Sequence, residues 1–101
     1  MKFKNTEGIE YEIIFRKPDR RTWGKDCDGV CFYPIDNGNK SKIYINPHRT
    51  NQTKLNTIIH EVAHAFFPDK SEKEITKYAN TMSRLLYNEL KWRKTKKDDI
   101  I

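Results

Sequence analysis

The chain has 101 residues and a formal net charge of +6, from 20 lysines and arginines against 14 aspartates and glutamates. This length predicts a single domain, residues 1–101, and the 12% aromatic content predicts a small globular core rather than a disordered chain. No apolar run approaches the length of a transmembrane helix, and the N-terminus lacks the apolar region of a signal peptide, so we expect a cytoplasmic protein without a membrane partner.

The first half of the chain predicts short strands separated by turns. Residues that favour β-structure gather in runs bounded by glycine, proline or polar residues. The polar stretch 18–25 predicts a loop, and Asp36-Asn37-Gly38-Asn39 is a strong turn signal. The expected strands are Lys2–Lys4, Ile9–Phe15, Gly29–Tyr33 and Lys42–Asn46.

Two cysteines, Cys27 and Cys31, lie close together in this first half. Two are too few for a disulfide framework. A second metal site would need a matching pair of cysteines or histidines elsewhere, and the sequence has none. We therefore expect free thiols in a reducing compartment.

The second half predicts two helices that pack on a small antiparallel sheet, which is an α+β fold. The first helix is expected from about Gln52 to Phe67, where Pro68 ends it. The second is expected to begin after Ser71, where the sequence fits a capping box, and to continue past Trp92 into a basic tail from about residue 93. Its apolar stripe is Ile75, Tyr78, Ala79, Met82, Leu85 and Leu86.

The first helix carries the motif H-E-x-x-H at His60, Glu61 and His64. Two histidines four residues apart lie one turn apart on one helical face, where both imidazoles can bind a single zinc ion. The glutamate after the first histidine can then act on a water as general base. The apolar stripe centred on Ile58, Ile59 and Val62 lies nearly opposite, so the histidines face solvent or a cleft lined by another element.

A catalytic zinc site needs a third protein ligand. The turn at Pro68 is short enough to bring the start of the second helix back beside the histidines, which makes Asp69, Glu72 and Glu74 the nearby acidic residues. Asp69 follows His64 by one residue less than the H-E-x-x-H-x-x-G-x-x-H pattern requires. Periodicity does not separate Glu72 from Glu74, and either can instead cap the helix.

The segment from Ile58 to Ala79 resembles the gluzincin type of zinc metallopeptidase, in which a glutamate of E-x-x-[A/S]-[D/N] on the next helix is the third ligand. That resemblance implies Glu72 as the ligand, although Ile75 and Thr76 depart from the motif. The stretch also resembles the ImmA/IrrE family. Residues 23–93 further resemble small SprT-like or minimal zincin proteins of phages and prophages, with a Pro68-Asp69 turn and Trp92-Arg93 at the end of the second helix.

These observations predict a zinc metallopeptidase with Zn²⁺ held by His60, His64 and Glu72. The strand Ile43–Ile45 is expected to pair with an extended peptide substrate, as edge strands do in zincins by resemblance. The sequence does not decide which residue stabilises the oxyanion; His48, Tyr44 and Arg49 are near in sequence, although a loop position for His48 is the simpler interpretation.

Two alternatives stay open. A chain this short has little room for a substrate cleft, which favours a zinc-containing binding or regulatory protein that does not cut. A small basic protein that binds nucleic acid and uses zinc only to support its fold is the second alternative. Trp23, Trp92 and the basic residues would suit it, although clustered charge also serves solubility and no nucleic-acid-binding motif is present. The basic clusters are Arg16, Lys17, Arg20, Arg21 and Lys25, and Lys91, Arg93, Lys94, Lys96 and Lys97.

Overall fold

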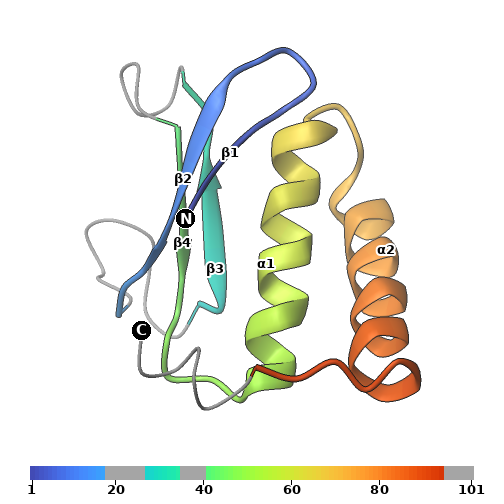
Figure 1. The fold of residues 1–101 in the computed structure, drawn as a ribbon. Coiled ribbons are helices and arrows are strands. Elements are labelled where there is room, and N and C mark those ends of the chain that lie inside the picture. Colours follow the sequence, from blue (N-terminus) through green and yellow to red (C-terminus); the bar gives the residue numbers. More distant parts are fainter. Residues whose placement is uncertain (18–26, 35–40, 95–101) are drawn as a thin grey trace.

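A four-stranded sheet, a helix packed on it and a second helix outside the first form the fold (Figure 1). The structure is a computed structural model that describes residues 1–17, 27–34 and 41–94. The α+β prediction is confirmed. The elements are β1 (Lys2–Lys4), β2 (Glu10–Phe15), β3 (Gly29–Phe32), β4 (Lys42–Ile45), α1 (Asn51–Phe66) and α2 (Glu72–Arg84), with a π-helical turn over Leu85–Glu89.

The strands lie in the order β1-β2-β4-β3, so β4 is internal and β3 is an edge strand. β1 pairs with β2 and β3 pairs with β4 in antiparallel fashion, but β2 and β4 run parallel. The sheet is therefore mixed, whereas the sequence predicted antiparallel pairing. The difference arises because the chain crosses from β2 to the outer edge before it returns as β4 between the two, an order that residue patterns do not specify.

The main core lies between the sheet and α1. Alternation along β4 points Ile43 and Ile45 towards α1, where both are fully buried beside Tyr11. Ile58 and Val62 of α1 pack against this cluster. A second set of contacts joins the helices through small or buried side chains, which let α2 approach α1 closely; these are Ala63, Ile75 and Ala79.

Side-chain caps fix where both helices begin. The Thr50 hydroxyl accepts a hydrogen bond from the Thr53 amide, and the Ser71 hydroxyl accepts one from the Glu74 amide, as expected for N-caps. The second helix ends earlier than predicted, at Glu89 after the π-helical turn, and Lys91 then takes a left-handed φ of 57° that stops the helical path before Trp92.

Some predicted features fall outside the described residues, namely the loop at 18–25 and the turn at 36–39. Cys27 and Cys31 are both described and form no disulfide. None of the helices in the described ranges has the length and apolar character that crossing a bilayer would require.

Candidate metal centre

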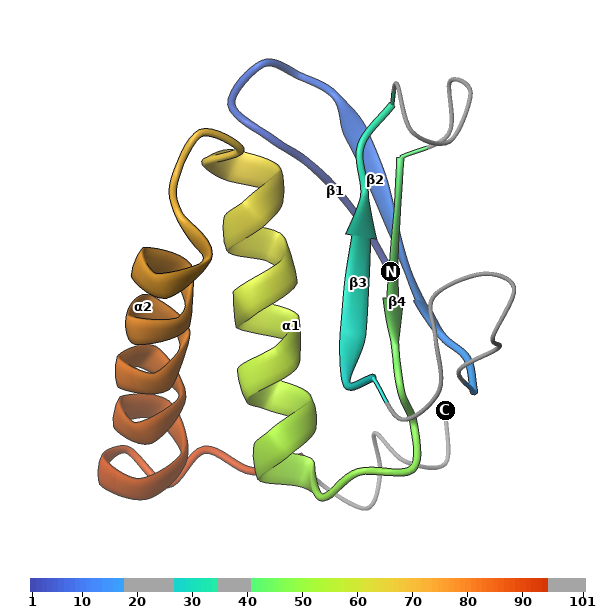
Figure 2. The same ribbon diagram turned by 180° about the vertical axis from the view of Figure 1, so that it is seen from behind.

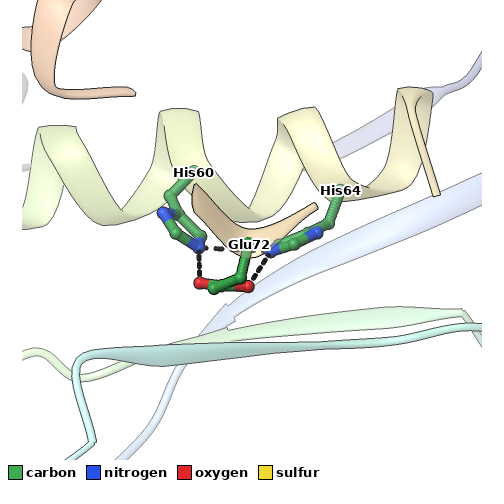
Figure 3. Close-up of side chains that lie close together, drawn as sticks. All are labelled: His60, His64 and Glu72. Atoms are coloured by element: carbon green, nitrogen blue, oxygen red, sulfur yellow. Dashed lines mark hydrogen bonds and ion pairs between the residues drawn. The ribbon is translucent and has the colours of Figure 1, made fainter. Parts of the chain in front are cut away.

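His60 and His64 of α1 and Glu72 at the start of α2 meet in one cluster (Figure 3). The Nε2 atoms of the two histidines lie 3.1 Å apart. Glu72 Oε1 is 2.6 Å from His60 Nε2, and Glu72 Oε2 is 2.9 Å from His64 Nε2. The structure thus brings together the three residues that the sequence analysis named as zinc ligands.

The turn after α1 explains why Glu72, rather than its acidic neighbours, reaches the histidines. Pro68 follows the end of α1, and Ser71 caps α2 at once, so Glu72 is the first residue of the returning helix. Glu74 turns back to its own N-cap, where its carboxylate accepts a hydrogen bond from the Ser71 hydroxyl at 3.1 Å. Asp69 is exposed and does not belong to the cluster.

The donor set of this cluster suits a cation better than a hydrogen-bond network. If both Nε2 atoms donate to Glu72, two N–H groups face each other at 3.1 Å. If one of them is deprotonated, its lone pair faces the carboxylate instead. Ligand atoms around a tetrahedral zinc ion lie about 3.3 Å apart, close to the spacing of these three groups. Two imidazole nitrogens and a carboxylate oxygen therefore fit Zn²⁺.

The cluster faces a hollow of about 310 Å³ between α1, β3 and the start of α2. The side chains of His60 and His64 are 16% and 15% exposed, whereas that of Glu72 is 70% exposed. The hollow is therefore open to solvent on the Glu72 side. Of the two orientations that the sequence allowed for the histidines, the structure has the one in which they face a cleft lined by other elements.

The Nδ1 atoms of His60 and His64 have no hydrogen-bond partner among the described residues. Within residues 1–17, 27–34 and 41–94, no carbonyl or carboxylate accepts a hydrogen bond from Nδ1 of His60 or His64. Such partners usually fix the ring and raise its basicity. The two rings line the hollow, and their Nε2 atoms contact the Glu72 carboxylate.

Glu61 is buried beside the cluster, with 8% of its surface exposed. Burial, and to a smaller extent the nearby negative charge of Glu72, raises the pKa of the Glu61 carboxyl to about 7. A carboxyl with a pKa near neutrality can both accept and return a proton, which is what a general base of hydrolysis must do.

This burial predicts how the stability of the metal-free protein depends on pH. Because the folded-state pKa of Glu61 is raised from 4.5 to about 7, its protonated form favours folding below about pH 4.5, and that contribution is lost as the pH rises through 7. The loss amounts to about 3 kcal/mol. Glu61→Gln should remove this pH dependence. In urea titrations, the free energy of unfolding of the variant minus that of wild type should therefore increase between about pH 5 and about pH 8. A constant difference between the two proteins would contradict the assignment.

Gly29 allows β3 to pack directly on α1 beside Glu61. A Cβ atom at this position would lie 2.5 Å from Thr57 Cγ2 and 2.9 Å from the Tyr44 carbonyl oxygen. Only a residue without a side chain fits this close approach. The contact closes one wall around Glu61, whose Cγ lies 3.5 Å from the same point.

Gly29→Ala is therefore expected to destabilise the protein by about 1–3 kcal/mol through overpacking. Thr57→Ser deletes the clashing methyl group but keeps the hydroxyl that donates to the Thr53 carbonyl. Added to Gly29→Ala, it should recover part of the lost stability, while alone it should cost stability. Urea unfolding of the four proteins measures this coupling. Purely additive effects would mean that the contact does not limit the packing of β3.

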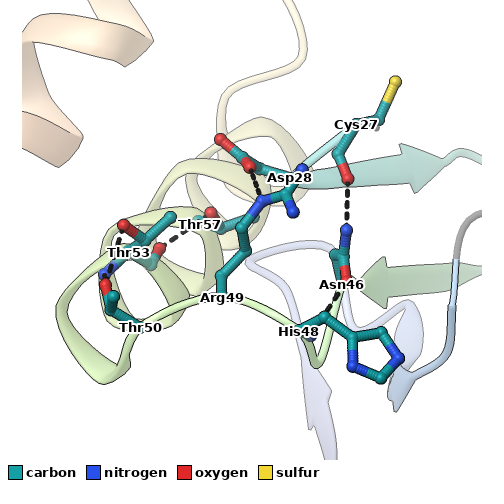
Figure 4. Close-up of polar contacts among 8 residues, drawn as sticks. All are labelled: Cys27, Asp28, Asn46, His48, Arg49, Thr50, Thr53 and Thr57. Atoms are coloured by element: carbon teal, nitrogen blue, oxygen red, sulfur yellow. Dashed lines mark hydrogen bonds and ion pairs between the residues drawn. The ribbon is translucent and has the colours of Figure 1, made fainter. Parts of the chain in front are cut away.

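None of the three residues considered for oxyanion stabilisation lines the hollow, and Figure 4 shows two of them, His48 and Arg49, beside Asn46 and Asp28. His48 and Arg49 belong to the turn before α1, where Arg49 pairs with Asp28. Tyr44 contacts Phe32 on the sheet face opposite α1. Sequence reasoning missed Tyr33, which lines the hollow and whose hydroxyl donates to the His64 carbonyl at 3.3 Å. Only the strand order brings Tyr33 here, so no local signal identified it.

The strand expected to pair with a peptide is also different. Both edges of Ile43–Ile45 are occupied, because β4 lies between β2 and β3. The expectation that this strand receives a substrate was therefore wrong. Among the described strands, the one at the sheet edge nearest to the cluster is β3, which contributes Gly29, Val30 and Cys31 to the hollow.

No family model, curated protein or solved structure matches this chain. The resemblance to gluzincins and to small phage zincins therefore stays an expectation that rests on the residues themselves. Of the basic clusters, Arg20, Arg21, Lys25, Lys96 and Lys97 lie outside the described residues, as does Trp23.

Proposed function

We propose that this protein is a zinc-dependent peptidase. The observation that carries the proposal is the convergence of Glu72 from α2 on both histidine nitrogens of α1, with the buried Glu61 beside them. Two imidazoles, one carboxylate and an adjacent carboxyl of raised pKa form the donor set and the base that metal-assisted hydrolysis requires. The opening of the hollow on the Glu72 side would admit water and substrate.

Each residue of the site has a role in this proposal. When bound, zinc supplies Lewis acidity, which strengthens water as a nucleophile and polarises the scissile carbonyl. Glu61 accepts the proton of the attacking water and returns it to the leaving amine, and the positive charge of the ion would lower its pKa enough to keep it ionised beforehand. Tyr33 lines the same hollow, and its hydroxyl could stabilise the developing oxyanion by exchanging its hydrogen bond to the His64 carbonyl for one to the substrate.

The edge of β3 supports a peptide as the substrate. An extended chain can add to a free strand edge by main-chain hydrogen bonds, which hold the backbone without demanding a particular sequence. β3 lies beside α1 and ends next to Tyr33. A peptide added to β3 would therefore pass the cluster of His60, His64 and Glu72.

The direct test is hydrolysis of a mixture of short synthetic peptides by the purified protein, followed by mass spectrometry. We expect cleavage to stop when a chelator removes the metal and to return when about one equivalent of zinc is added back. His48→Ala, which alters a histidine outside the hollow, serves as the control and should behave as wild type. Cleavage that persists in full after removal of the metal would contradict the proposal.

A further inference from the structure

A second hollow, of about 480 Å³, lies between the N-terminal half of α1 and the C-terminal half of α2. Asp28, which immediately precedes β3, borders it on the sheet side, and the view in Figure 2 shows β3, α1 and α2 side by side in this region. Its walls are almost entirely polar. The residues used below are Asp28, Thr53, Asn56, Asn80, Ser83 and Arg84.

This polar hollow continues the hollow at the metal centre along one face of α1. Thr57 lines the polar hollow, and Glu61, one turn later, lines the hollow at the metal centre. On the sheet side, the border passes from Asp28 to its neighbour Gly29. The two hollows therefore adjoin where Gly29 packs on Thr57. A chain that leaves the metal centre towards the start of α1 enters the polar hollow.

The walls offer unsatisfied polar groups to a ligand. Ser83 is 2% exposed, yet its hydroxyl has no hydrogen-bond partner among the described side chains and carbonyls. A buried hydroxyl without a partner costs free energy that a ligand can recover. Asn56 donates to Asn80 across the hollow at 2.9 Å, which leaves the amide NH₂ of Asn80 and the carbonyl oxygen of Asn56 able to bond further.

The charges of the hollow favour an anionic ligand. Asp28 is neutralised by Arg49, whose Nε lies 2.7 Å from the carboxylate (Figure 4). Arg84 is exposed and forms no ion pair with any residue in the described ranges. The hollow therefore carries the unpaired positive charge of the Arg84 guanidinium, and a guanidinium pairs well with a carboxylate.

We propose that this polar hollow binds an acidic side chain of the peptide substrate, three to four residues after the cleaved bond. The inference rests on the proposed peptidase function. β3 and α1 run in the same direction, because Gly29 meets Thr57 and Tyr33 meets His64. A peptide that adds to β3 in antiparallel fashion therefore carries the residues after the cleaved bond towards Arg84.

The position of the acidic residue follows from helix geometry. The Asn56–Asn80 hydrogen bond sets the level of α2 against α1, and Arg84 lies one turn beyond Asn80. Along the axis of α1, the level of Arg84 therefore lies about 12 Å from His60, at about 1.5 Å per helical residue. An extended peptide covers this distance in about three to four residues.

The test uses synthetic peptides in a serine–alanine background, each with a single glutamate or a single lysine at one position. Cleavage by the zinc-loaded protein is followed by mass spectrometry, and binding of the same peptides, labelled with fluorescein, by anisotropy. We expect kcat/KM to be about tenfold higher for glutamate than for lysine at the third or fourth position after the cleaved bond. Arg84→Gln should abolish this preference. Lys4→Gln removes the same charge from β1, at the opposite edge of the sheet, and should leave the preference unchanged.

The outcomes separate the two proposals. Cleavage without a preference for glutamate, or a preference that Lys4→Gln weakens as much as Arg84→Gln, would overturn the polar-hollow inference and leave the peptidase proposal standing. Binding that prefers glutamate and depends on Arg84, but without cleavage, would support the inference and overturn the peptidase. Neither cleavage nor binding would overturn both.

Discussion

Replacing Glu61 by glutamine is expected to lower kcat/KM for peptide hydrolysis by about a hundredfold to ten-thousandfold, the usual contribution of a general base. Glutamine has nearly the same shape, so it should fit the site that Gly29, Thr57 and the histidines form around Glu61. It cannot take a proton from water. Because the residue lies outside the set of three ligands, zinc content should stay at the wild-type level.

The control for this change is Glu12→Gln, which alters a half-buried glutamate of β2 that pairs with Lys42 on the sheet. Cleavage by the Glu12 variant should equal that of wild type. If Glu61→Gln still cuts at the wild-type rate, Glu61 is not the base. A different outcome is that wild type binds zinc and peptides but cuts nothing, and that Glu61→Gln keeps every biological effect. The protein would then act by binding, which is the alternative that its short chain favours.

The second large effect is expected at the third ligand. Glu72→Ala should weaken zinc binding by more than about a hundredfold, since a site of three ligands loses a substantial share of a binding free energy that is typically about 10 kcal/mol or more. The loss should be specific to this glutamate, because Glu72 is the only acidic residue in the described ranges that reaches both Nε2 atoms. Competition with a chromophoric chelator measures the zinc dissociation constant of each variant.

Glu74→Ala is the matched control, on the same turn of the same helix. It removes the partner of the Ser71 hydroxyl and should cost about 1 kcal/mol of stability through the capping box, but it should leave zinc affinity within about threefold of wild type. Equal losses of zinc affinity in the two variants would mean that both glutamates affect zinc binding only by stabilising the start of α2, and that neither is a ligand. A larger loss of zinc affinity in Glu74→Ala than in Glu72→Ala would mean that Glu74, and not Glu72, is the third ligand.

The candidate metal centre could be predicted in part because one of its two components is local. The spacing of His60 and His64 fixes their common face on any α-helix. Glu72 depends on the tertiary packing of α2 against α1, so helical periodicity left Glu74 equally plausible, and the family resemblance rather than the pattern selected Glu72. The capping box at Ser71 correctly placed the start of α2, because the capping chemistry is also local.

The sheet was harder to predict because strand order is a long-range property. The ranges of all four strands were close to those observed, yet nothing in the residue pattern places β4 between β2 and β3. That insertion places β3 at the edge of the described sheet, brings Tyr33 to the hollow and requires a glycine at position 29. Each of these features depends on a neighbour distant in sequence, and each was therefore missed.

Zinc stoichiometry tests the central claim most directly. Metal analysis of the protein purified at neutral pH without added zinc should find about one zinc ion per chain, and His64→Ala should lose it while His48→Ala keeps it. The two variants remove the same side chain, once from the cluster and once from the turn before α1. Substoichiometric zinc in the wild-type protein, which adding zinc does not correct, would contradict the assignment of His60, His64 and Glu72 as a metal centre.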